Sequence, residues 1–153
     1  MKKTSLIKFA TLALTVIVAM AININAQETD KFTLTVTATG LHNSKGRVQF
    51  ALYNKDGTIP DQHYKKYYKK KTAPIKNGSA TTVFKNLPKG RYAVNILHDE
   101  NSNGKIDKRF IKPIEGIGFT NYTSIGLTNR PKFSKASFML TSNTKKQIKI
   151  IYL

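Results

Sequence analysis

The chain has 153 residues, no cysteine, and 26 Lys and Arg against 8 Asp and Glu, which gives a formal net charge of +18. The lack of cysteine excludes disulfide bonds and lipid attachment through a cysteine. The charge predicts attraction to polyanions, such as an acidic glycan or another anionic envelope component, or more simply solubility with weak adhesion to an envelope. No feature indicates specific recognition of nucleic acid, and the charge says nothing about the fold.

Residues 1–26 are expected to be a signal peptide. Lys2 and Lys3 supply the positive start, and the apolar run Phe9–Ile22 is shorter than the roughly 20 residues that span a bilayer. Ala26 is a small residue suited to the cleavage position, although an uncleaved anchor is the alternative. Cleavage would leave residues 27–153 as one domain in the periplasm or outside the cell, without a transmembrane segment.

The rest of the chain alternates apolar and polar residues with a period of two, which is typical of β-strands. The predicted strands are Phe32–Thr39, Arg47–Tyr53, Thr72–Ile75, Ser79–Phe84, Arg91–His98, Ser134–Leu140 and Gln147–Leu153. The third and fourth should form a hairpin because Asn77-Gly78 is a strong turn signal. Residues 114–131 are expected to be a long connection. About seven short strands predict an all-β fold, a single antiparallel β-sandwich.

The nine residues after the predicted strand Arg91–His98 have the spacing of a calcium loop. Oxygen-bearing side chains occupy the first, third, fifth and ninth positions, and glycine occupies the sixth, where the loop must turn sharply. Ile106 should point away from the ion and pin the loop to the core. The predicted calcium ligands are Asp99, Asn101, Asn103, Lys105 through its carbonyl oxygen, and Asp107.

This loop departs from a tight calcium sensor. The twelfth position, where a bidentate Glu would complete an EF-hand, is Phe110, and the neighbouring Lys and Arg side chains repel cations. Glu100 or Glu115 could add a donor. We expect a dissociation constant on the order of 10⁻⁴–10⁻³ M, as in extracellular modules. The alternative is a polar turn in which Asp and Asn side chains cap their own backbone.

Two further segments carry functional hypotheses. The segment Tyr64–Lys71 interleaves tyrosines with lysines, so it is a candidate for binding a polyanion or a glycan; the alternative is a solvated edge strand whose lysines prevent aggregation. His98, followed by Asp99, is a candidate base for a hydrolase. No G-x-S-x-G elbow, zinc spacing or phosphate-binding glycine loop accompanies it, so we expect a protein that is not an enzyme.

The segments LTVTATGLHNSKGRVQFALYN, LPKGRYAVNILHDENSNGKID and EGIGFTN resemble domain-of-unknown-function family 2141. The resemblance spans about Leu34 to Ile150 and implies a small exported bacterial protein without an assigned activity. The Leu87–Asp107 segment is also loosely similar to the last strands of immunoglobulin-like and transthyretin-like repeats, which implies that type of sandwich. The family's Pro-Pro turn is replaced here by a segment containing only Pro131. The resulting expectation is a non-catalytic binding or envelope-accessory module.

Overall fold

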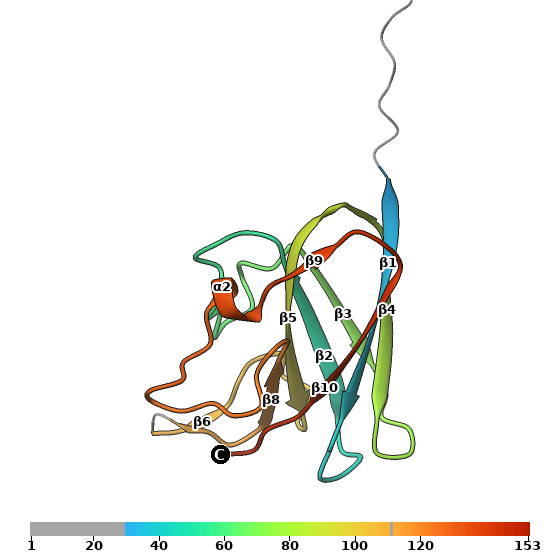
Figure 1. Cartoon of the computed structure of the whole chain (residues 1–153). Helices are drawn as coiled ribbons and strands as arrows, with labels where there is room; N and C mark the ends of the chain where they lie inside the picture. The colour runs from blue at the N-terminus through green and yellow to red at the C-terminus, as the bar shows by residue number, and fades with distance from the viewer. Residues whose placement is uncertain (1–29, 111) are drawn as a thin grey trace, which may run out of the picture.

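The computed structural model of the protein describes residues 30–110 and 112–153 (Figure 1). The predicted signal peptide lies outside the described residues. No helix in the described part is long and apolar enough to cross a membrane. The elements are β1 (Lys31–Thr39), β2 (Arg47–Tyr53), β3 (Lys69–Ala73), β4 (Ala80–Pro88), β5 (Gly90–Asp99), β6 (Lys108–Arg109), β7 (Lys112–Pro113), β8 (Gly116–Phe119), α2 (Phe133–Ala136), β9 (Phe138–Leu140) and β10 (Thr144–Lys149).

The strands form two main sheets that pack against each other, so the predicted all-β sandwich is confirmed. One sheet has the order β10-β1-β4, and the other has the order β3-β2-β5-β8 with β9 paired to one end of β5. The strands β6 and β7 form a separate two-stranded hairpin. Neighbouring strands run antiparallel with one exception within the described residues, because β10 runs parallel to β1.

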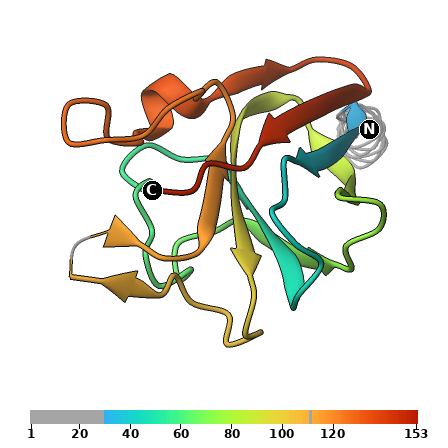
Figure 2. The ribbon, with the colours of Figure 1, turned by 90° about the horizontal axis from the view of Figure 1, so that it is seen from below.

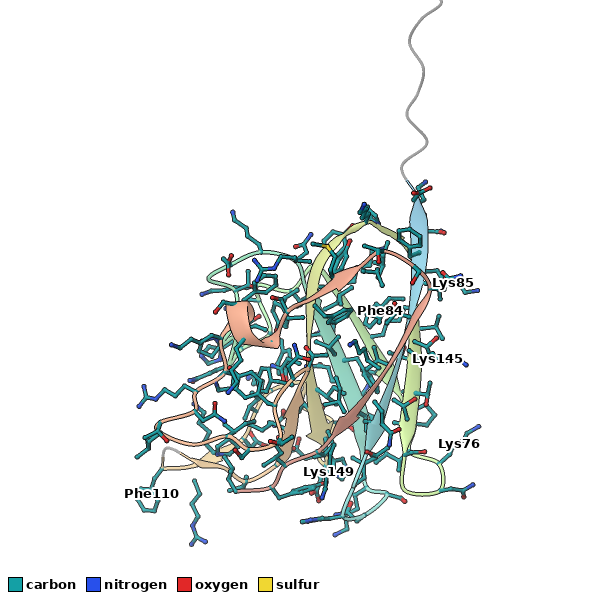
Figure 3. The ribbon with its side chains drawn as sticks, viewed as in Figure 1. Lys76, Phe84, Lys85, Phe110, Lys145 and Lys149 are labelled. Atoms are coloured by element: carbon teal, nitrogen blue, oxygen red, sulfur yellow. The ribbon has the colours of Figure 1, made fainter. Side chains whose placement is uncertain are left out.

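The main core lies between the two sheets, where the predicted alternation places it. Leu34, Val36 and Ala38 of β1 face Val48, Phe50 and Leu52 of β2, and all six are fully buried. Phe84 of β4 reaches into the same layer (Figure 3). Burying an aliphatic or aromatic side chain of this kind contributes roughly 1.5–3 kcal/mol, which lets the fold stand without disulfides.

A second core covers the outer face of the five-stranded sheet. Ala51 and Tyr53 of β2, with Ala93 and Leu97 of β5, point away from the first core and are also fully buried. The segments that cover them are the loop after β2, the loop that carries Ile106 and the segment that carries α2, which gather on one side of the sheet in Figure 2. The molecule therefore has a third layer made largely of loops.

The expected hairpin between Thr72–Ile75 and Ser79–Phe84 is wrong. The turn itself forms, with φ of 49° at Asn77 and 70° at Gly78 and a 2.8 Å bond from the Lys76 N–H to the Ser79 carbonyl. Beyond it β3 pairs with β2 while β4 pairs with β1, so the chain crosses from one sheet to the other. The crossing places Ala73 of β3 and Ala80 and Phe84 of β4 in the core between the two sheets.

The connection expected at 114–131 contains the strand β8. Its two glycines hide the strand pattern, and the structure explains them: a Cβ at Gly116 would lie 2.4 Å from Ile150 Cγ2, and one at Gly118 would lie 3.0 Å from Ile148 Cγ2. Glycine in a strand often marks such a close approach. The last predicted strands also shift, because residues 133–136 form the short helix α2 and β10 occupies Thr144–Lys149.

Candidate functional site: a polar loop beside an apolar cleft

The predicted calcium loop begins where β5 ends. Asp99 is 1% exposed, and its two carboxylate oxygens each accept a backbone hydrogen bond at 2.9 Å, one from Asn103 and one from Gly104. Positive φ values at Ser102 (61°) and Gly104 (75°) bend the chain around this carboxylate. The sequence forms the turn because Asp and Asn side chains bond readily to backbone N–H groups a few residues ahead.

The other predicted ligands converge on the same turn. Both side-chain amides donate to Oδ2 of Asp107, from Asn101 at 2.6 Å and from Asn103 at 2.9 Å. Their Oδ1 atoms accept backbone N–H groups, from Asn103 at 3.0 Å and from Lys105 at 2.8 Å. The structure therefore brings together the four side chains of the predicted set. Lys105 joins the turn through its N–H, and the use of its carbonyl oxygen as a ligand stays a prediction.

Glu115 ties this loop to the start of β8. It is 5% exposed, and its two oxygens accept the N–H groups of Glu100 at 3.0 Å and Asp107 at 3.1 Å. Burial raises the pKa of Glu115, and these two hydrogen bonds oppose the rise. Of the two additional donors considered from the sequence, Glu115 lies against the loop. Glu100 instead accepts a hydrogen bond from Asn43 in the β1–β2 turn, at 3.1 Å.

The loop could bind a hard cation only through carboxylate oxygens combined with amide and carbonyl oxygens. In the described part of the chain, no three His, Cys, Asp or Glu residues group closely enough to hold a metal. Calcium, however, also accepts amide and backbone carbonyl oxygens. The amides of Asn101 and Asn103 present nitrogen to Asp107, and rotation of each by half a turn would present oxygen instead.

His98 is fully buried, and both of its ring nitrogens are engaged. Nε2 lies 3.0 Å from the carbonyl oxygen of Lys45, which can only accept, so Nε2 carries the proton. Nδ1 then accepts from the Tyr152 hydroxyl at 2.7 Å. Tyr152 also stacks on His42, with ring centroids 3.6 Å apart. His98 thus packs under the β1–β2 turn and does not line a concavity.

The Tyr64–Lys71 segment divides between the core and the surface. Tyr64 is 4% exposed and belongs to the second core, whereas Tyr67 and Tyr68 are 38% and 41% exposed. Lys69 to Lys71 lie on β3, an edge strand of the five-stranded sheet. Nζ of Lys71 donates to the Val83 carbonyl at 2.7 Å, so it reaches across to the edge strand β4 of the opposite sheet.

A cleft of about 770 Å³ opens on the outer face of the five-stranded sheet. Its walls are apolar and come from the polar loop, β7, β8 and the segment before α2: Ile106, Pro113, Ile117, Phe119, Ile125 and Pro131. At its mouth Phe110 and Leu127 are 95% and 74% exposed, and Phe110 projects from the body of the molecule (Figure 3). The volume falls in the range of small-molecule sites.

A buried polar cluster lies at the floor of this cleft. Asp61, which is 6% exposed, accepts the Tyr53 hydroxyl at 3.2 Å and the N–H groups of Lys65 and Lys66 at 3.1 and 2.7 Å. Burial raises the pKa of Tyr53 and of Tyr64 far above that of a free phenol. The nearby Asn95 amide opposes this rise in the pKa of both tyrosines.

In this cluster, the Asn95 amide and the Tyr64 hydroxyl have no hydrogen-bond partner in the described part of the chain. Asn95 is 1% exposed, and neither its nitrogen nor its oxygen has a hydrogen-bond partner among the described residues; the same holds for the hydroxyl of Tyr64. Asn95 also lines the cleft. Buried polar groups are normally paired, and an unpaired one costs roughly 1–3 kcal/mol.

Sequence reasoning missed this cleft because it assigned one buried face to each strand. The signal was present in RVQFALY and RYAVNILH, where Ala51, Tyr53, Ala93 and Leu97 continue the apolar character on the second face. A strand that is apolar on both faces indicates cover on both sides of its sheet. A single Asn within such a strand, Asn95, then marks a polar group in an otherwise apolar layer.

One family of known sequences matches the chain. The family described as "Uncharacterized protein conserved in bacteria (DUF2141)" matches residues 36–149, a range that runs from within β1 to the end of β10 and includes both the loop and the cleft. No curated protein and no solved structure matches the chain significantly.

Proposed function

We propose that the chain, which belongs to the uncharacterized bacterial family DUF2141, is an exported, non-catalytic binding module in which a calcium loop braces a ligand cleft. The observation that carries the proposal is the position of Ile106. This residue lies within the polar loop, packs against the second core and lines the cleft. An ion held by the loop would therefore fix one wall of the cleft.

The cleft supports a binding role through its size and its lining. Small-molecule sites are typically apolar concavities with a few polar groups that orient the ligand. Here the walls are aliphatic and aromatic, and the polar groups Asp61 and Asn95 lie at the floor. The mouth carries Lys108 and Arg130, which suits the envelope setting that the net charge suggests.

The loop supports calcium through its donors and its linkage to the cleft. Asp99, Asn101, Asn103 and Asp107 already surround one turn, and Glu115 joins that turn to β8. With two loop carboxylates and basic neighbours, the affinity should be on the order of 10⁻⁴–10⁻³ M. The ion would have a structural role, in a fold that has no disulfide.

The surroundings of His98 support a non-catalytic role. A general base must lie within hydrogen-bond reach of the proton that it abstracts. His98 is fully buried, and its two nitrogens bind Lys45 and Tyr152. Export to the periplasm or the cell exterior rests on the predicted signal peptide at 1–26.

Ligand-observed NMR with a library of neutral aromatic fragments tests the binding role. The blocking variant is Gly126→Trp, because Gly126 lines the cleft and a Cβ there meets no atom within 4 Å. The control is Met139→Trp, which places the same indole at an exposed position of β9 that does not line the cleft. Fragments should bind to the wild type and the control and lose binding in the blocking variant. A library without hits, or hits that the blocking variant retains, contradicts the proposal.

A further inference from the structure

We propose that the floor of the cleft recognises a neutral carboxamide or lactam group attached to an apolar body, with Asn95 as the residue that pairs with it. This inference deepens the proposed binding function and rests on the cleft being the binding site. It concerns which ligands enter the cleft rather than whether the cleft binds any.

The unpaired Asn95 amide carries the argument. Its side chain offers donors and an acceptor side by side, and none of them makes a hydrogen bond of good geometry within the described residues, although the hydroxyls of Tyr53 and Tyr64 lie close by. A carboxamide or lactam presents the complementary pair, a carbonyl next to an N–H, and can satisfy both at once. The Tyr64 hydroxyl, which also has no hydrogen bond of good geometry within the described residues, lies beside Asn95 behind the cleft lining. A ligand that supplies these bonds recovers the cost of leaving the groups unpaired.

The neighbouring carboxylate selects against a charged head group. Asp61 lines the floor next to Asn95 and is 6% exposed, so it is poorly screened by water. The hydrogen bonds that it receives from Tyr53, Lys65 and Lys66 hold it in place. A ligand carboxylate at this floor would be repelled by Asp61 and would lose more hydration than a neutral amide, whereas Lys108 and Arg130 lie at the exposed mouth, where water screens their charge.

The walls select the rest of the ligand. Ile117 and Phe119 of β8 face Ile125 and Pro131 across the cleft, and none of these side chains can hydrogen-bond. An aromatic or branched aliphatic body would therefore fill the cleft above the amide. The ligand class is an amphipathic small molecule with a neutral amide end.

The position of Asn95 allows a test of its role by substitution. It occupies the centre of β5, opposite Ala51 of β2 and Phe119 of β8, in a largely apolar layer that also contains the buried side chains of Gln49 and Asp61. A leucine of similar volume would remove the unpaired groups, so Asn95→Leu should unfold at the wild-type temperature or above it.

The test is an NMR titration of the wild-type protein with phenylacetamide, and with phenylacetate as the probe of equal shape and negative charge. We expect phenylacetamide to shift the amide signals of Ile117 and Phe119, phenylacetate to bind at least tenfold more weakly, and Asn95→Leu to lose at least tenfold in phenylacetamide affinity without a lower unfolding temperature. Asn95→Ala provides the same comparison if the leucine variant does not fold.

The outcomes separate this inference from the proposed function. Equal binding of phenylacetamide and phenylacetate, or full binding by the Asn95 variants, overturns the amide assignment while leaving the cleft as a binding site. A marked loss of stability in both Asn95 variants, in the absence of any probe, also overturns it, because Asn95 would then have a structural partner. If neither these two probes nor the fragment library shifts a cleft signal, the binding function itself fails.

Discussion

Calcium should raise the thermal stability of the protein by an amount that follows from the dissociation constant expected for the loop. For a dissociation constant of about 10⁻⁴–10⁻³ M, 10 mM calcium would stabilise the folded state by about 1.4–2.7 kcal/mol. With an unfolding entropy of about 2.1 cal/mol/K per residue over the described chain, this corresponds to about 5–10 °C in the unfolding midpoint. The measurement is differential scanning calorimetry in calcium and in EDTA.

The comparison needs constant ionic strength, because a chain of net charge +18 is stabilised by any salt that screens its self-repulsion. Magnesium at the same concentration is the ion control, since it keeps its waters and demands a stricter geometry than calcium.

Asp107→Asn is the decisive variant for this experiment. Asp107 Oδ2 accepts only exposed side-chain amides, so losing its charge should cost little without calcium. The calcium shift should fall to about 2 °C or less, because one of the two loop carboxylates is gone. Asp56→Asn removes the same charge at an exposed position outside the loop and should keep the full shift. An equal midpoint shift with magnesium, or an undiminished shift in Asp107→Asn, would refute the reasoning.

Three other outcomes follow from the structure. Gly46→Ala should lower the free energy of unfolding by more than about 2 kcal/mol in urea melts, because the φ of Gly46 is +64° and a Cβ there would lie 2.0 Å from the Asp99 carbonyl oxygen. The control Gly78→Ala should cost only about 1 kcal/mol, because Gly78 has φ +70° and no atom within 4 Å of a Cβ. Equal losses in the two variants would contradict the close approach at Gly46. The stability that the buried Tyr53 and Tyr64 contribute should be fully present below pH 10 and fall as pH rises above it, because burial raises the pKa of both above the unfolded value of about 10. Tyr64→Phe should flatten this fall by about 1.4 kcal/mol per pH unit, and an unchanged slope would count against a buried Tyr64. On heparin, changing Lys69, Lys70 and Lys71 to Gln should lower the eluting salt no more than the same change at Lys76, Lys145 and Lys149 (Figure 3), and a clearly larger drop would favour a polyanion site at Tyr64–Lys71.

Local sequence patterns predicted the strands whose side chains fill the core between the two sheets. β1, β2 and β5 alternate or continue apolar residues over their whole length, and their bounds differ from the predictions by at most one residue. The turn at Asn77-Gly78 was also predictable from its two residues, because both adopt positive φ. The partners of the flanking strands were not predictable, since pairing depends on which sheet has a free edge.

The glycines of β8 misled the prediction in a definable way. Gly116 and Gly118 indicated a connecting loop, yet they lie in a strand. Glycine is needed at both positions because the segment of β10 and Ile150 passes close to their backbone. Long-range contacts of this kind leave no local pattern. The parallel pairing of β1 with β10 is another example, because these strands are more than 100 residues apart in the chain.

The polar loop of the candidate site was predictable from the sequence, and the cleft was not. The spacing from Asp99 to Asp107 predicted a polar turn, and the structure has that turn, with Asp and Asn oxygens bonded to backbone N–H groups, whereas calcium itself stays a prediction. The cleft could not be predicted, since its floor joins Asp61 from a loop and Asn95 from β5, and its walls come from segments after residue 105. Only the fold brings these groups together.

The most direct test of the account is a calcium titration followed by ¹H–¹⁵N NMR, with phenylacetamide added at each end of the titration. We predict saturable shifts at Asn103, Gly104 and Lys105 in the millimolar range, accompanying shifts at Ile106 and Ile117, and tighter phenylacetamide binding in saturating calcium. Shifts that grow linearly and spread over the whole surface would contradict a calcium site. Saturable loop shifts with an unmoved Ile117 and unchanged phenylacetamide affinity would contradict the claim that the loop braces the cleft.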